Sequence, residues 1–195
     1  MHLDIRPLSG QFVRLEPFTP GLKEEVRTAL DCDQESWALV SSTSQGEAFD
    51  PGWDKALEQL ETGELVSYAV RRLSDGRVVG RSCYLNIRKA DNGLEIGATF
   101  YQPDARGGPV NPEAKLLLLA HAFDSGAMRV ELRTDALNVR SQAAIAKLGA
   151  QREGTLRRHV VTWTGRVRDT VVYAVTDEDW PAVSDGLTAR LAAYA

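Results

Sequence analysis

The chain contains, at residues 106–113, the stretch Arg-Gly-Gly-Pro-Val-Asn-Pro-Glu, which is typical of a glycine-rich turn that leads directly into a helix. The two glycines let the backbone turn tightly and approach a ligand closely. Asn111 suits the N-cap of this helix, and Pro112 then falls at the first helical position. The N–H groups at such a helix start attract a phosphate, and Arg106 adds a positive charge. Taken alone, the stretch also fits a well-capped buried helix that follows a tight turn.

Length and composition indicate an ordinary globular protein. The chain has 195 residues, of which 43% are hydrophobic and 26% are charged, and these values predict a single domain over residues 1–195. The formal net charge of −4 argues against nucleic acid as the main partner, because duplex binding usually needs a basic face. No apolar run is long enough to span a membrane, and the N-terminus does not resemble a signal peptide, so we expect a cytoplasmic protein without a membrane partner.

The cysteines and histidines do not form a pattern that holds a metal. Cys32 and Cys83 lie far apart in the sequence, as do His2, His121 and His159. We therefore expect neither a metal site nor a disulfide.

Hydrophobic patterning predicts a mixed α+β domain built on one sheet. A Ser-Asp-Gly turn at 74–76 between two extended segments predicts a hairpin. A polar loop at 41–52 is expected to border a substrate site. Strands are expected at 12–18, 65–72, 77–87, 94–100, 129–134, 155–163 and 167–175, and helices at 20–30, 53–61, 112 to about 126, 139–148 and 177–193.

Four short motifs follow one another in the central part of the chain. They are Leu-Glu-Ile-Gly at 94–97, the glycine-rich stretch 106–111, Asn-x-x-Ser at 138–141 and Lys-Leu-Gly-Ala at 147–150. Their order and spacing resemble the acetyl-CoA-binding core of the GNAT N-acetyltransferase superfamily, in particular the branch of bacterial enzymes that acetylate the N-termini of ribosomal proteins. The glycine-rich stretch stands where that family has a pyrophosphate loop of the form Gln/Arg-x-x-Gly-x-Gly/Ala.

The resemblance implies a GNAT-like fold, with one mostly antiparallel, V-shaped sheet that contains a splayed parallel strand pair and is flanked by helices. The pantetheine arm of CoA would lie between strands 94–100 and 129–134, whose unpaired edges can bond its amides. Asn138 would bond the same arm, although it equally suits the N-cap of the following helix. No metal is implied. The CoA-binding residues implied are Arg106, Gly107, Gly108, Val110, Asn111, Asn138 and Ser141.

The implied reaction is direct attack of a primary amine on the acetyl thioester, with acetyl-CoA as cosubstrate. Glu95 is the candidate base, and an exposed strand carboxylate is its alternative interpretation. Many superfamily members have a tyrosine acid where this chain has Ile145, so Ser141 is the nearest replacement. For Ser141, a hydrogen bond to CoA or a helix-start role is the favoured interpretation. Asp135 and His159 are weaker candidates for the proton transfers.

The acceptor is expected to be a protein N-terminus or a small amine of low pKa. Freeing a lysine amine at pH 7 costs about 4–5 kcal/mol, whereas an α-amine costs about 1 kcal/mol. A site without a strong base therefore suits the α-amine.

A non-catalytic CoA-binding sensor or assembly module with the same fold is the alternative. Two departures from the family pattern motivate it: Ile145 replaces the tyrosine, and Pro109 replaces a loop glycine and so removes one N–H donor. The sequence is compatible with a homodimer but specifies no oligomeric state.

Overall fold

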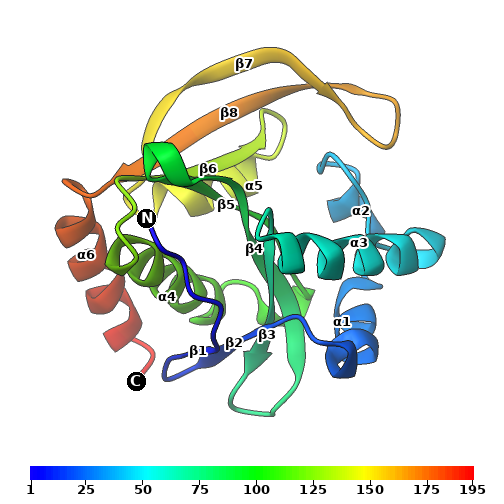
Figure 1. Ribbon diagram of the computed structural model, residues 1–195, viewed down its shortest axis with the longest axis horizontal. Coiled ribbons are helices and arrows are strands. Elements are labelled where there is room, and N and C mark those ends of the chain that lie inside the picture. Colours follow the sequence, from blue (N-terminus) through cyan, green and yellow to red (C-terminus); the bar gives the residue numbers. More distant parts are fainter.

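The computed structural model describes all residues from 1 to 195. Its centre is an eight-stranded sheet with the order β1-β2-β3-β4-β5-β6-β8-β7 (Figure 1). Every neighbouring pair is antiparallel except β5 and β6, which are parallel. The expected mostly antiparallel sheet with one parallel pair is therefore confirmed. The strands are β1 (Leu8–Ser9), β2 (Val13–Pro17), β3 (Val66–Arg72), β4 (Val78–Arg88), β5 (Gly93–Tyr101), β6 (Arg129–Asp135), β7 (Gln151–Val161) and β8 (Val167–Thr176).

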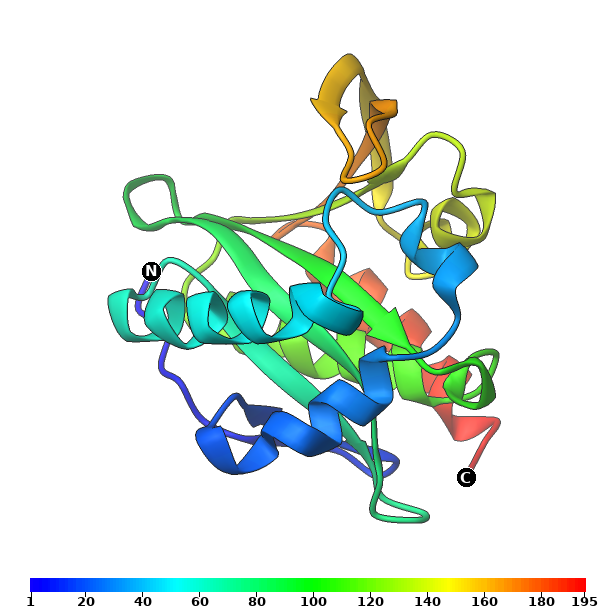
Figure 2. The same ribbon diagram turned by 90° about the vertical axis from the view of Figure 1, so that its right-hand side faces the viewer.

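Helices cover both faces of the sheet. Figure 2 shows α1 and α3 in front of the sheet and α6 behind it. None of the helices combines the length and the hydrophobicity that crossing a bilayer requires. The α-helices are α1 (Lys23–Leu30), α2 (Gln34–Trp37), α3 (Phe49–Thr62), α4 (Val110–Asp124), α5 (Val139–Ala146) and α6 (Trp180–Ala192), and the 3-10 turns are η1 (Pro20–Leu22), η2 (Gly46–Ala48), η3 (Lys89–Asp91) and η4 (Pro103–Ala105).

Two hydrophobic cores hold these layers together, one on each face. The larger core packs α4, α5 and α6 against the sheet, and the smaller one packs α1, α2 and α3 against the other face. Stacked aromatic pairs dominate the smaller core, because Phe18 lies 4.5 Å from Trp53 and Trp37 lies 4.6 Å from Phe100 between ring centroids. The burial of such large apolar side chains is the main source of stability.

The start of α4 differs from the prediction. The helix begins at Val110, and Pro109 before it already has helical angles (φ −74°, ψ −15°). Asn111 therefore lies in the first turn and is not the N-cap, so that prediction is wrong. The physical reason is that the proline ring fixes φ near the helical value, which lets the turn close earlier.

The segment between α1 and α3 is also more ordered than the predicted loop at 41–52. The short helix α2 precedes it, and α3 begins at Phe49 rather than Trp53. Both additions pack an aromatic residue into the smaller core, since Trp37 and Phe49 are buried. Tertiary packing thus overrides the weak local helix signal of this polar stretch.

A buried carboxylate ties α4 to the N-terminal hairpin. Glu113 accepts hydrogen bonds from the backbone N–H groups of Gln11 (2.8 Å), Phe12 (2.7 Å) and Val13 (2.6 Å). The turn approaches closely, because a Cβ atom on Gly10 would lie 2.4 Å from the Glu113 carboxyl carbon. The first turn of α4, which carries the candidate phosphate loop, is thereby fixed to the sheet.

Replacing Glu113 by Gln should lower the free energy of unfolding by about 2–4 kcal/mol, because an amide leaves at least one of these N–H groups unpaired. Chemical denaturation followed by circular dichroism measures the change. Glu58→Gln, on the exposed face of α3, is the control and should change stability by less than about 0.5 kcal/mol. An equal effect of the two substitutions would contradict the proposed tie.

Candidate functional site

The parallel strands β5 and β6 separate after a short paired stretch. Only three pairs join them, from Gly93 with Arg129 to Glu95 with Glu131. Beyond Glu95, β5 stays with β4, whereas β6 stays with β8 as far as Asp135. The edges that face each other beyond this point have no ladder partner, so their backbone groups are available to an extended ligand.

A bulge in β5 lies beside this opening. The register between β4 and β5 shifts between Arg81 and Cys83, and Ala98 has a φ of +47°. A bulge of this kind bends the strand and increases its twist, which turns β5 away from β6. The strained residue thus lies next to the site.

A cavity of about 980 Å³ occupies the opening. On one side it is lined by the glycine-rich stretch, the first turn of α4 and the start of α5; on the other, by β4, α3 and residues 39–44. The volume is ample for a ligand of the size that fills most binding sites.

Four backbone N–H groups at the start of α4 have no partner in the protein. They belong to Gly107, Gly108, Val110 and Asn111, whereas the N–H of Arg106 donates to Pro103. Gly107 has a φ of +79°, a conformation that glycine adopts without strain. Free N–H groups at the positive end of a 15-residue helix have the geometry and the dipole that favour an anion.

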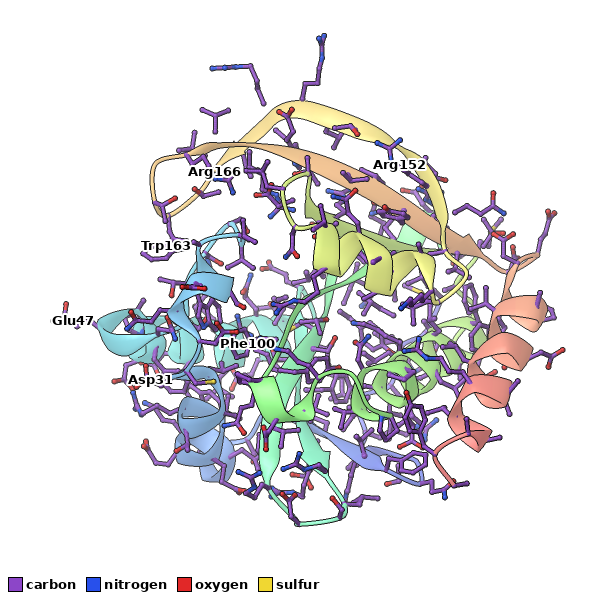
Figure 3. All side chains as sticks on the ribbon, turned by 180° about the vertical axis from the view of Figure 1, so that it is seen from behind. Asp31, Glu47, Phe100, Arg152, Trp163 and Arg166 are labelled. Atoms are coloured by element: carbon purple, nitrogen blue, oxygen red, sulfur yellow. The ribbon has the colours of Figure 1, made fainter.

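The Arg106 side chain lies beside this turn, but protein groups already occupy several of its donors. Its Nε donates to the carbonyl oxygen of Tyr101 at 2.8 Å, and its Nη1 pairs with Asp33. The guanidinium also lies 5.5 Å from the centroid of Phe100, which Figure 3 labels near the centre of the molecule. Asp33 neutralises part of the positive charge of Arg106, which the sequence predicts to contact the phosphate. The contact of Arg106 with a ligand therefore stays a prediction.

Asn138 and Ser141 both line the cavity at the start of α5. The Oδ1 atom of Asn138 accepts a hydrogen bond from the Ser141 N–H at 3.0 Å, so the capping interpretation is confirmed. The amide nitrogen of the same side chain donates to no protein group and remains available to a ligand. A single asparagine can therefore cap the helix with its oxygen and bind with its nitrogen.

Glu95 is buried, with 7% of its surface exposed, so the alternative of an exposed carboxylate is wrong. Asn86 donates to its Oε2 at 2.7 Å, and Arg133 lies 3.5 Å from the same oxygen. Burial raises the pKa of Glu95, and the attraction of Arg133 only partly offsets this effect. The Oε1 atom makes no hydrogen bond within the protein, and Glu95 is one of the residues that line the cavity. A carboxylate with a raised pKa at a cavity wall fits a general base.

The weaker candidates are held by other groups. Asp135 is buried, pairs with Arg166 and accepts the Leu137 N–H at 2.9 Å. His159 contacts the Thr170 hydroxyl at 3.1 Å. Both line the cavity, but the carboxylate of Asp135 is already engaged by the Arg166 guanidinium.

The β7–β8 hairpin closes over the cavity from the side opposite α4. Trp163 at its tip donates its ring N–H to the Trp37 carbonyl at 2.8 Å, and its backbone N–H to the Ser41 carbonyl at 3.0 Å. Figure 2 shows the hairpin tip above the segment that joins α2 and α3, and Figure 3 labels Trp163 there. These contacts link two segments that are more than 120 residues apart in sequence.

One buried cation at the site escaped the sequence analysis. Lys115 in α4 is 5% exposed, and its Nζ donates to Thr99 at 2.6 Å and to Ser82 at 3.0 Å. It thereby joins β4 to β5 at the bulge. Burial lowers the pKa of Lys115 to about 7. A single charged residue within the apolar run 114–123 was the available signal.

Comparison with known proteins identifies the family. Residues 13–151 match the family model described as an acetyltransferase (GNAT) domain. A GCN5-related N-acetyltransferase from Brucella melitensis superposes with a TM-score of 0.87 at 29% identity, over 95% of this chain and 85% of that one. A protein from T. thermophilus described as an acetyltransferase gives 0.84 at 35% identity, over 98% and 100%.

A more distant structure shares the fold. Mycobacterium smegmatis RimJ, solved in complex with CoA-disulfide, superposes with a TM-score of 0.81 at 22% identity, over 97% of each chain. A search of curated protein sequences returned no match.

The buried Lys115 should make stability depend on pH. The unfolded lysine titrates near ~10.4, above its folded pKa of about 7. Between these values the unfolded state binds more protons, so stability should rise with pH, by at most about 1.4 kcal/mol per pH unit. Below pH 7 this contribution is flat.

The measurement is denaturant unfolding of the wild type and of Lys115→Met from pH 7 to 9, because the tyrosines begin to titrate above that range. The Ser82 and Thr99 hydroxyls, 2.7 Å apart, still bond each other in the variant. We expect the difference between the two proteins to change steadily in this window. Parallel pH profiles would show that Lys115 keeps its ordinary pKa.

Proposed function

This chain belongs to the GNAT acetyltransferase family, and on that premise we propose that it transfers the acetyl group of acetyl-CoA to a primary amine, with residues 1–195 acting as one domain. The observation that carries the proposal is the opening between β5 and β6, which faces four unpaired N–H groups at the start of α4. An extended chain of amides that ends in a pyrophosphate matches both features.

The binding of acetyl-CoA follows from these donors. In the proposed pose, Gly107, Gly108, Val110 and Asn111 hold the pyrophosphate through their N–H groups, and Arg106 adds charge with Asp33 as its counter-ion. The pantetheine amides bond the open edges of β5 and β6 and the side-chain nitrogen of Asn138. The missing N–H of Pro109 leaves four backbone donors rather than five.

Glu95 is proposed as the base. The free amine attacks the thioester carbonyl carbon, the C–N bond forms, and the C–S bond breaks. The proton that the nitrogen must lose once the C–N bond has formed passes to Glu95, directly or through a water molecule, and the departing thiolate takes a proton from Ser141 or from solvent. Backbone N–H groups of β5 near the bulge stabilise the oxyanion. The aliphatic side chain of Ile145 has no proton to donate, so it contributes no acid.

The acceptor is proposed to be an amine of low pKa, either a protein N-terminus or a small molecule. Ribosomal-protein-S5-alanine acetyltransferase from Vibrio fischeri, whose name gives an alanine of a ribosomal protein as its acceptor, shares the fold with a TM-score of 0.75 at 14% identity, over 90% of this chain and 99% of that one. The acceptor side of the cavity lies between residues 39–44, α3 and the hairpin. Binding of acetyl-CoA without turnover of any amine would instead favour the non-catalytic module.

Glu95→Gln should lower kcat by about 10²-fold while leaving acetyl-CoA affinity unchanged, because the amide removes the base but keeps the shape. In the wild type, kcat/KM should fall as the pH drops through the raised pKa of Glu95. Initial rates of CoA thiol release, measured over a range of pH, give kcat and kcat/KM for both proteins.

Glu131→Gln is the matched control on the neighbouring strand. The charge of Glu131 helps to raise the pKa of Glu95, so this variant should keep the acidic limb of the profile but move it to lower pH. An acidic limb that survives in Glu95→Gln would assign the base to another group.

Asn138→Asp should separate capping from binding. The carboxylate keeps the oxygen that caps α5 but loses the amide donor, so thermal stability should persist while acetyl-CoA binds about 10-fold more weakly. Asn138→Ala should lose both. Isothermal titration calorimetry and thermal melting measure the two effects, and unchanged affinity in both variants would assign Asn138 to capping alone.

A further inference from the structure

The arginine at position 81 has no partner within the protein. It lies in the middle of β4, opposite Phe100 of β5, and its side chain lines the large cavity. None of its N–H groups donates a hydrogen bond, no carboxylate lies within ion-pair distance, and its Nε atom is buried. Its one defined contact is with the Trp37 ring, whose centroid is 5.7 Å from the guanidinium carbon.

Two other arginines at the cavity are neutralised by carboxylates. Arg106 has Asp33, and Arg133 has Glu131 at 2.7 Å. Arg81 differs from them, because burial lowers its pKa and the only titratable neighbour that offsets this effect is the Cys83 thiol. Arg81 is half-buried and has no counter-ion, and an uncompensated charge that is partly withdrawn from water calls for a partner.

A trapped water molecule does not satisfy this side chain. The small void beside Arg81, lined also by Ser44 and Trp53, measures about 10 Å³. That is the space of at most one water, which accepts two hydrogen bonds, whereas a guanidinium has five N–H donors. The remaining donors are left for a molecule that enters the large cavity.

The cavity favours an anion at this point. Only two of its lining residues are carboxylates, Glu95 and Asp135, and Asp135 is already paired with Arg166. On the acceptor side Arg81 and the exposed Lys55 have no carboxylate partner, and Arg168 has only Asp135, at 3.9 Å. The acceptor side therefore carries a positive potential that the protein itself does not cancel.

Arg81 and Glu95 lie on the same face of the sheet. Glu95 pairs with Leu85 in the register of β4 and β5, and Leu85 follows Arg81 in β4 by an even number of residues, four. Four residues along β4 correspond to about 13 Å between the backbone positions of Arg81 and Leu85, the partner of Glu95. The face opposite α4 thus presents a base at one end and a guanidinium at the other.

We propose that the amine acceptor carries a carboxylate, which Arg81 binds while Glu95 receives the proton of the amine. A guanidinium fork matches a carboxylate through two parallel hydrogen bonds, and the carboxylate supplies the missing counter-ion. The acceptor class is accordingly an amino acid, a short peptide or an N-terminal segment with a nearby acidic group. This inference rests on the proposed acetyl transfer.

The test compares acceptors that differ only in this charge. Diglycine, triglycine and tetraglycine are offered as acceptors, each as the free acid and as the C-terminal amide. The increasing length places the carboxylate progressively farther from the amine. For the best length, the wild type should favour the acid by about 10- to 100-fold in kcat/KM. Arg81→Gln should bring that ratio to within about twofold of one while still acetylating the amide.

Lys55→Gln is the matched control, because it removes the same charge from the same cavity wall, and it should keep the preference. If Arg81→Gln fails to fold, Arg81→Lys serves instead and should reduce the ratio by losing the fork. Equal rates for acid and amide at every length, or a preference that survives in Arg81→Gln, would overturn the inference.

A binding measurement separates this inference from the transfer itself. N-acetyl-diglycine, as acid and as amide, is titrated into the protein in the presence of CoA. Tighter binding of the acid by about 10-fold or more, lost in Arg81→Gln, would support carboxylate recognition even if no amine is acetylated. Acetylation of amides without any acid preference would leave the proposed function intact and overturn the role of Arg81.

Discussion

The separation of β5 from β6 after Glu95 is the constraint on which the rest of the site depends. Backbone groups at a sheet opening need partners, and here the opening is kept because each strand is paired with another neighbour on its other side. β6 is paired with β8 over all seven of its residues. β5 is held to β4 across its bulge, where Lys115 bonds Ser82 and Thr99. The opening is therefore built into the sheet and does not require a ligand to form it.

The arginines around this opening are shared unequally between the carboxylates Glu131 and Glu95, and this difference gives the two carboxylates different properties. The Glu131 carboxylate forms ion pairs with the guanidinium groups of Arg88 at 2.9 Å and Arg133 at 2.7 Å. Burial raises its pKa, but these ion pairs outweigh that effect, so the pKa of Glu131 falls. Glu95 is left with Arg133 at 3.5 Å, and for this carboxyl the cost of burial outweighs the attraction. Two neighbouring carboxylates thus differ in basicity because one takes most of the arginine donors. On the acceptor side no carboxylate remains for Arg81.

Local patterns in the sequence were sufficient for most of the fold. The hairpin of β3 and β4, the strand β6 and the helix that follows it were expected within a few residues, because alternation and glycine stops are local signals. The parallel pair came from the order of four motifs, not from periodicity. The start of α4 was missed because Pro109 was treated as part of the turn rather than as a helical residue.

The chemistry of the site depended on contacts that the sequence does not display. The burial of Glu95 follows from its pairing with Leu85 and Glu131, and the partner of Arg106 is Asp33, 73 residues away. Arg81 and Lys115 are single charges within apolar segments, which is a visible signal, but whether each finds a partner is decided by the fold. The sequence predicts Asn138 and Ser141 as site residues, but it does not show that the asparagine oxygen caps α5 while its nitrogen has no partner in the protein.

Hydrogen–deuterium exchange of the backbone amides, with and without acetyl-CoA, tests the central claim most directly. The account predicts new protection at Gly107, Gly108, Val110 and Asn111 and along the facing edges of β5 and β6 beyond Glu95, with none in the N-terminal hairpin. Binding of acetyl-CoA that leaves these amides unprotected would contradict the assignment of the opening as its site.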